Sequence, residues 1–168
     1  MRALRLRSLL HGERQTIAGT IYGTIVVLSL LTAGAAAYKH DLWRLGVITA
    51  SSMVVLWAAH VYSHGLGESV TSGRRLSLAE LAAIARREAS IVLAAVLPLA
   101  AVGLGAAGVV GDAAALWIAF GLGVAALAVQ AVRYAQLERL SGAGTVLAVA
   151  LNLGFGLVFV ALKTLLAH

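Results

Sequence analysis

The residues best suited to chemistry lie in one apolar stretch, where His60, His64 and Glu68 follow one another at intervals of four residues. This spacing places them along one face of an α-helix, provided that the helix continues through Gly65 and Gly67. Titratable groups at membrane depth are costly and mark functional sites by default. His64 and Glu68 lie near the end of the apolar stretch, where water lowers that cost. His60, one turn deeper, is therefore the strongest candidate.

Three kinds of chemistry would use this face. A proton relay or pH sensor would use the imidazoles, because histidine changes charge near neutral pH. A metal site would use His60 and His64 with Glu68 as the third ligand, although the His-Glu-x-x-His pattern of zinc proteases is absent. Haem would need a facing histidine, and His11, His40 and His168 all lie at the ends of apolar stretches. Haem would then be held only between subunits, and the cofactor stays unknown.

Transmembrane helices are the elements that must position these residues. The chain is 61% apolar and only 12% charged, whereas a soluble domain carries roughly twice that charge. A helix needs roughly 20 apolar residues to cross a hydrocarbon core about 30 Å thick. We therefore predict an all-α, polytopic transmembrane bundle, a single membrane domain over 1–168. The expected spans are 16–37, 42–64, 89–110, 113–135 and 143–167.

The basic residues predict the orientation. With the N-terminus inside, ten basic residues fall on the cytoplasmic side and three on the other, as the positive-inside rule requires. The inner set is Arg2, Arg5, Arg7, Arg14, Arg74, Arg75, Arg86, Arg87, Arg133 and Arg139, and the outer set is Lys39, Arg44 and Lys163. The sequence thus predicts a multi-pass protein of a bacterial inner membrane, with its C-terminus outside.

The first apolar stretch also imitates a secretory signal peptide, because a basic start precedes it and Ala35-Ala36-Ala37 resembles a cleavage site. A signal core would not need the polar residues Thr16, Thr20, Tyr22 and Thr24. We therefore expect a retained span.

The only sizeable polar stretch is 65–88, expected to be a cytoplasmic loop. Within it Ser77 and Glu80 match a capping box, which predicts a helix from about Leu78. This helix either lies on the membrane surface or continues into the third span. Pro98 removes one helical hydrogen bond and predicts a kink in that span.

A polar strip runs along the first span, where Thr16, Thr20 and Thr24 recur every four residues beside Gly19 and Gly23. One interpretation is a close-packing seam whose hydroxyls bond carbonyls of the preceding turn. The other is a polar strip facing an ion route. Both interpretations bring the first span against the second.

Three further polar residues fall within apolar stretches. Gln130 and Arg133 approach the inner end of the fourth span, and Asn152 lies near the middle of the fifth. The amide of Asn152 needs a partner that lipid does not provide, so it should face a helix or a conduit. Arg133 is expected to extend its charge to the head groups.

Several classes of function are disfavoured. Without cysteine, disulfides and thiolate sites are excluded. The net charge of +6 comes from arginines beside apolar segments, so the predicted partners are anionic lipid head groups and not nucleic acid. No serine triad, P-loop or paired-carboxylate pattern is present, and the Gly-rich run at 103–108 ends an apolar span. We therefore expect no enzyme.

Two stretches resemble the bacterial and lysosomal potassium channels whose first helix opens Arg-x-x-x-Phe-Ser-Asp. Arg14 is followed by Ala18-Gly19-Thr20, and Trp57 precedes His60 by three residues. The Phe-Ser-Asp triplet is missing and one span fewer is predicted, so no pore residue is carried over. The chain also resembles the small Ala- and Val-rich membrane proteins of high-GC bacteria.

These features lead to three hypotheses. The first is a homo-oligomeric channel or carrier for protons or inorganic cations, since five thin helices hardly enclose a conduit alone. Its pathway candidates are His60, His64, Glu68, Thr16, Thr20, Thr24, Gln130 and Asn152. The second is an accessory or scaffold subunit of a larger membrane complex. The third is a metal- or haem-binding membrane protein.

Overall fold

The structure is a computed structural model that describes residues 2–38 and 40–166, with side chains for 12–38, 40–162 and 165. Several predictions therefore fall on side chains outside the described residues: Arg2, Arg5, Arg7, His11, Lys39, Lys163 and His168. The regular structure of the described residues is entirely α-helical, which confirms the all-α part of the predicted fold class. The helices are α1 (Arg2–Ala37), α2 (Leu42–Ser72), α3 (Leu78–Arg87), α4 (Ala89–Leu93), α5 (Val96–Ala106), α6 (Asp112–Leu137) and α7 (Gly142–Leu166).

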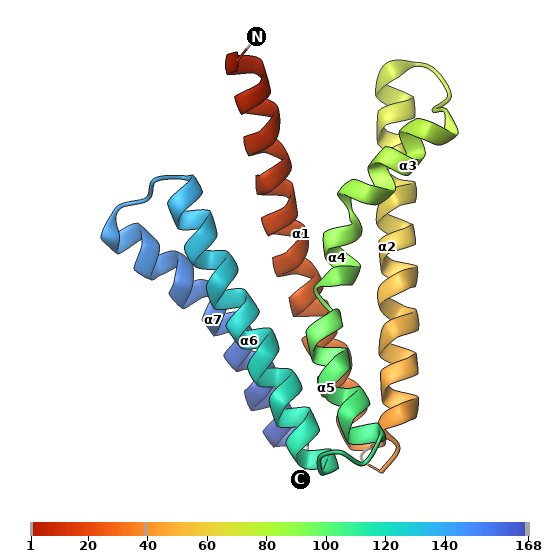
Figure 1. Cartoon of the computed structure of the whole chain (residues 1–168), viewed down its shortest axis with the longest axis vertical. Coiled ribbons are helices and arrows are strands. Elements are labelled where there is room, and N and C mark those ends of the chain that lie inside the picture. Colours follow the sequence, from red (N-terminus) through yellow and green to blue (C-terminus); the bar gives the residue numbers. More distant parts are fainter. Residues whose placement is uncertain (1, 39, 167–168) are drawn as a thin grey trace.

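The helices run up and down along one bundle. The start of α1 and the end of α7 lie at opposite ends, which we call the N-terminal and C-terminal ends of the bundle (Figure 1). Four of the described helices are long and apolar enough to cross a membrane: Gly12–Ala37, Leu42–Ser72, Asp112–Leu137 and Gly142–Leu162. The bent pair Leu78–Leu93 and Val96–Ala106 makes a fifth if it counts as one span. The chain thus has the architecture of a multi-pass membrane protein.

The polar stretch 65–88 differs from the predicted loop. Helix α2 continues through Gly65 and Gly67 to Ser72, and the connection to α3 is only the turn at Gly73, whose φ is 65°, and the few residues after it. Side chains of the turn and of α3, namely Leu76, Leu81 and Ile84, pack against Gly65. The capping box of Ser77 and Glu80 is present, and α3 begins at Leu78 as predicted.

The third span is broken, as Pro98 predicts. Its two parts, Leu78–Leu93 and Val96–Ala106, meet at an angle of 50°. The break at Ala94 and Ala95 lies about one turn before Pro98, which has no N–H to bond the carbonyl of Ala94. A second interruption at Glu88 separates α3 from α4. Helix α3 is therefore the first segment of the broken third span, set off from α4 at Glu88.

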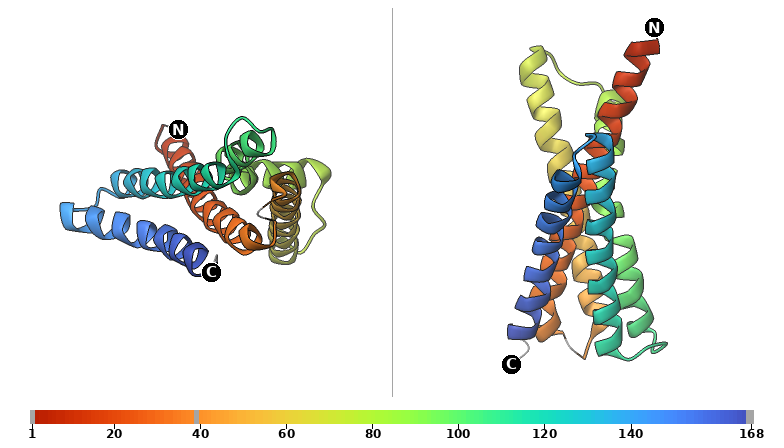
Figure 2. Two further views of the ribbon diagram at one scale, coloured as in Figure 1. Left: turned by 90° about the horizontal axis from the view of Figure 1, so that it is seen from below. Right: turned by 90° about the vertical axis from the view of Figure 1, so that its left-hand side faces the viewer.

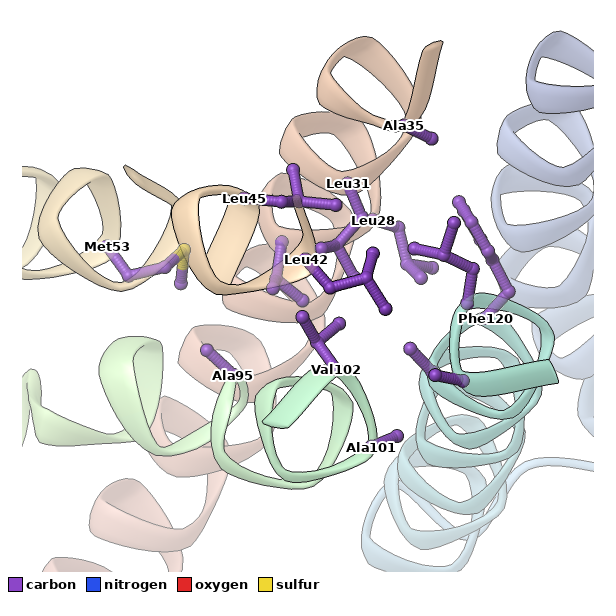
Figure 3. Packing of buried hydrophobic residues seen from close by; sticks show 14 of the residues in the cluster. Leu28, Leu31, Ala35, Leu42, Leu45, Met53, Ala95, Ala101, Val102 and Phe120 are labelled. Carbon is purple, nitrogen blue, oxygen red and sulfur yellow. The ribbon is translucent and has the colours of Figure 1, made fainter. Parts of the chain in front are cut away.

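Helix α1 is the centre of the bundle. Figure 2 shows it running between the α6 and α7 pair on one side and α2 on the other. Its buried side chains join those of four other helices in one apolar cluster at the C-terminal end of the bundle (Figure 3). Leucines of α1 and α2, Val102 of α5 and Phe120 of α6 contribute to it. This half of the bundle is packed with apolar side chains.

The glycine seam of α1 packs against a different helix from the predicted one. A Cβ atom at Gly19 would collide with the hydroxyl of Ser90, and one at Gly23 would collide with the carbonyl oxygen of Ile91. Both neighbours belong to α4, so the glycine seam is where the broken third span packs closely against α1. The first span does pack against the second, as the contact of Tyr22 with His60 shows, but its two glycines face α4. At Gly23 the neighbour is a backbone carbonyl, which leaves no room for a side chain.

Candidate functional site

Helix α2 presents His60 and His64 to neighbouring helices near the N-terminal end of the bundle. The ring centroid of His60 lies 5.1 Å from that of Tyr22 on α1, with the rings tilted by 47°. The rings of His60 and His64 are 6.3 Å apart in an edge-to-face arrangement. Because α2 is continuous here, the spacing of four residues stacks the imidazoles along one face, as predicted.

Hydrogen bonds assign the same tautomer to both imidazoles. Nδ1 of His60 lies 3.1 Å from the carbonyl oxygen of Leu56, and Nδ1 of His64 lies 2.9 Å from Oε1 of Glu88. Carbonyl and carboxylate oxygens only accept, so each Nδ1 donates. In the neutral rings the lone pair is then on Nε2, for which the described residues provide no hydrogen bond. Each Nε2 is therefore available to take a proton.

Three charged side chains, Glu68, Arg87 and Glu88, lie beside the rings of Tyr22, His60 and His64. We call these six residues the histidine network. Arg87 donates from Nε to Glu88 at 3.5 Å and from Nη2 to Glu68 at 3.3 Å. The side chain of Glu88 is only 13% exposed, so its charge is poorly solvated. Two carboxylates share one guanidinium, and this leaves one excess negative charge while both imidazoles are neutral. A proton on either imidazole balances it.

The network opens into a groove of about 500 Å³ between α2, α3 and their connecting turn, which we call the vestibule. Its lining residues are Ser63, His64, Gly67, Glu68, Thr71, Ser72, Arg74, Leu76 and Glu80. Helix α2 has 31 residues, about 46 Å at 1.5 Å per residue, and so exceeds a hydrocarbon core about 30 Å thick. Its polar last turns, which line the vestibule, are the part suited to the membrane surface.

Charges in the turn are held as a fixed ion pair. Hydrogen bonds from Arg74, and then from the backbone and hydroxyl of Ser77, lower the pKa of Glu80 to about 2. The same contact with Glu80 raises the pKa of Arg74. Neither group changes charge near neutral pH. His64 is thus the vestibule residue of a type that does.

The predicted metal ligands do not converge. Glu68 bonds to Arg87 and His64 bonds to Glu88. In the described part of the chain, no three His, Asp or Glu side chains gather in a way that would hold a metal ion. Metal binding by His60, His64 and Glu68 stays a prediction, and it would require Glu68 to leave Arg87.

The threonine strip of α1 has internal partners. Thr16, Thr20 and Thr24 each donate to the carbonyl four residues earlier, at 2.8 to 2.9 Å. Their exposure falls from Thr16, which is exposed, to Thr24, which is fully buried. This is the close-packing interpretation of the strip, and none of the three lines the vestibule.

The other predicted polar residues lie away from the histidine network. Asn152 on α7 donates to the carbonyl of Ala148 at 3.0 Å, within its own helix. Gln130 on α6 accepts from Arg133 at 3.5 Å. Arg133 also bonds Glu13 of α1 at 3.3 Å, so its expected extension to the head groups gives way to an interhelical ion pair.

Some partners were missed from the sequence. Tyr22, Arg87 and Glu88 belong to the network only because α1 and the α3–α4 junction pack beside α2. Arg87 and Glu88 stand at the boundary between polar and apolar sequence, which is the one signal that singled them out. A second ion pair, Arg14 to Glu138 at 2.9 Å, joins α1 to α6 beside the pair formed by Arg133. Together these two pairs clamp the N-terminal end of the bundle.

No model of a protein family, no characterised protein and no solved structure matches the chain. The residues that resemble the potassium channels have local partners. Arg14 pairs with Glu138, and the indole N–H of Trp57 donates to the carbonyl of Ala85 on α3 at 3.0 Å. Function is therefore inferred from the geometry of the histidine network.

Proposed function

We propose that this protein moves protons across a membrane as a homo-oligomeric channel or carrier, with His60 and His64 as the groups that accept them. The observation that carries the proposal is a run of titratable side chains that begins at Glu68 in the vestibule and ends at Tyr22. Tyr22 contacts His60, which lies about two helical turns from Glu68 along α2. The network contains two carboxylates and one guanidinium, and the Nε2 atom of each imidazole has no hydrogen-bond partner among the described residues, which supports the proposal. With the N-terminus in the cytoplasm, as the arginine distribution favours, the vestibule opens to the cytoplasm of a bacterial cell.

The first step would be at His64. A proton from water in the vestibule binds Nε2, and the imidazolium keeps its Nδ1–H on Glu88, where the carboxylate balances its charge. Transfer to His60 needs a bridging water or a ring rotation, because the ring centroids are 6.3 Å apart. Tyr22 then stands at the inner end of the network.

Beyond Tyr22, the apolar cluster of α1, α2, α5 and α6 fills the C-terminal half of the bundle. Such packing excludes water from the interior of one copy. A proton would complete its path either through a movement of the bundle or along a contact between copies, which is why the proposal includes a homo-oligomer.

Protons fit better than inorganic cations. A cation route needs oxygen atoms that replace the hydration shell. The hydroxyls of Thr16, Thr20 and Thr24 and the amide N–H of Asn152 are directed to carbonyls of their own helices. None of these four side chains lines the vestibule, whereas His64 and Glu68 do, and this placement favours a proton route along α2.

Flux measurements on reconstituted vesicles test the proposal. A pH-sensitive dye inside the vesicles reports proton entry after a pH jump at fixed membrane potential. His60→Ala and His64→Ala are each expected to reduce the rate at least tenfold, and His40→Ala, at an exposed site at the C-terminal end of the bundle, serves as the matched control. Wild-type vesicles no more permeable than protein-free vesicles would refute proton transport.

A second candidate is an accessory or scaffold subunit. In the apolar window of α7 only 6% of the residues are buried within the chain. Gly154 of α7 and Gly121 of α6 both face open space, which suits close approach of a partner helix. Stoichiometric co-purification of a larger membrane protein, with no flux from the purified chain, would favour this alternative. A native pull-down that returns only the chain itself would count against it.

A further inference from the structure

At Glu88, where α3 meets α4, the broken third span lies between α1 and α2. On one side of this junction α4, only five residues long, is seated against Gly19 and Gly23 of α1 by contacts that leave no room for a methyl group. On the other side α3 leans on α2. The backbone of Glu88, at φ −82° and ψ −3°, ends one helix and begins the next. A change in the contact between α2 and the junction is therefore a change in how the third span docks.

Three side-chain contacts join α2 to the junction. Trp57 donates to the carbonyl of Ala85 at 3.0 Å, and Glu68 accepts from Arg87 at 3.3 Å. His64 donates to Glu88 at 2.9 Å. The indole stays neutral and the guanidinium stays positively charged across the physiological range, whereas histidine is the side chain that changes charge between about pH 5 and 8.

We infer that His64 and Glu88 form a pH-sensitive latch, which holds the broken third span against α2 when His64 is protonated and loosens when it is neutral. The inference rests on the proposed function, because the same imidazole takes up the transported proton. It adds a mechanical consequence: proton occupancy would set the docking of the third span. A carrier needs such a link between occupancy and conformation.

The sign follows from the charges around His64. The junction supplies Glu88 and Arg87, α2 supplies Glu68 and His60, and α1 supplies Tyr22. The turn adds the fixed Arg74–Glu80 pair. While His64 is protonated, its imidazolium and the carboxylate of Glu88 carry opposite charges, and this attraction adds to the hydrogen bond from Nδ1. As the pH rises, His64 loses its charge, and only the hydrogen bond from its neutral Nδ1–H to Glu88 remains.

Trp57 is a built-in probe of this contact, because its indole bonds α3. Replacing Trp43 and Trp117 by Phe leaves Trp57 as the single tryptophan of the full chain. In lipid nanodiscs, the Trp57 emission is expected to shift between pH 5.5 and pH 8. His64→Gln keeps a neutral N–H donor and should abolish the shift, and Glu88→Gln should do the same.

Two histidine variants act as controls. His60 lies one turn from Trp57, so a charge on His60 could itself quench the Trp57 fluorescence. If the latch causes the pH-dependent emission shift, His60→Gln must retain that shift. His40→Gln, at the opposite end of the bundle, must also retain it. A second readout uses the absence of cysteine: spin labels at Val70→Cys and Ala82→Cys, both exposed, measure the separation of α2 and α3. That separation should widen at pH 8 and stay constant in His64→Gln.

Different results would overturn the latch and the proposed proton transport. A pH shift that survives in His64→Gln, or no shift in either readout, overturns the latch even if proton flux is measured. A shift lost only in His64→Gln and Glu88→Gln supports the latch, and the absence of flux would then refute transport alone.

Discussion

Replacing Gly23 by alanine is expected to displace the broken third span from α1. The added Cβ would lie 3.0 Å from Cβ of Ala94 and from the carbonyl carbon of Ile91, and closer still to the Ile91 oxygen. Two of these three atoms belong to the backbone, so no side-chain rotation relieves the contact. The helices must separate, and the hydroxyl of Ser90 beside Gly19 loses its close packing as well.

The magnitude follows from overpacking, which costs about 1–3 kcal/mol when a methyl group enters a filled contact. Alanine is favoured over glycine in a helix by about 1 kcal/mol, so the net loss expected for Gly23→Ala is about 0–2 kcal/mol. Gly121→Ala is the matched control, because Gly121 is helical and has nothing within 4 Å of an added Cβ. It should be neutral or stabilising by up to about 1 kcal/mol.

Reversible unfolding in mixed micelles, followed by far-UV circular dichroism, measures both variants in the same series. Proton flux should fall in Gly23→Ala and stay unchanged in Gly121→Ala, because only the first moves the α3–α4 junction that carries Glu88. Equal stabilities for the two variants would show that the α1–α4 contact yields without cost and would refute the argument from close packing.

Three other predictions concern charges and metal. Substituting Gln for Arg14 and Glu138 singly and together should give a coupling energy of about 0.2–1 kcal/mol in a double-mutant cycle, since both side chains are partly exposed; a coupling of zero would contradict the clamp. The pKa of Glu80 is lowered to about 2 in the folded chain, so its ionised form stabilises the fold at pH values above the ordinary pKa of a carboxyl group. This stabilisation is lost as the pH falls through about 2. In a thermal-stability profile from pH 7 to pH 2, Glu80→Gln should therefore lose less stability at acid pH than the wild type does. Chelation of divalent metals should leave proton flux unchanged, because Glu68 is bonded to Arg87; a chelator-sensitive flux with stoichiometric zinc by elemental analysis would restore the metal hypothesis.

The sequence alone predicted several helices of membrane length and several local features. Apolar length predicted the long helices, because a bilayer imposes one simple requirement on segment length. The capping box at Ser77 and the kink before Pro98 also followed from the sequence, since each depends on atoms within about one turn. The alignment of His60, His64 and Glu68 followed from helical periodicity once α2 proved continuous.

The tertiary structure decided which partners these residues meet. Gly19 and Gly23 seat α4 and not α2, Arg133 bonds Glu13, and Glu88 joins His64. Helical periodicity defines a face but not the neighbour that covers it, because helix crossings in a bundle depend on the shapes of all the packed surfaces together. The apolar residues thus determined that the chain forms helices long enough to cross a membrane, whereas the packing of the broken third span determined that Glu88 and Arg87 meet His64 and Glu68.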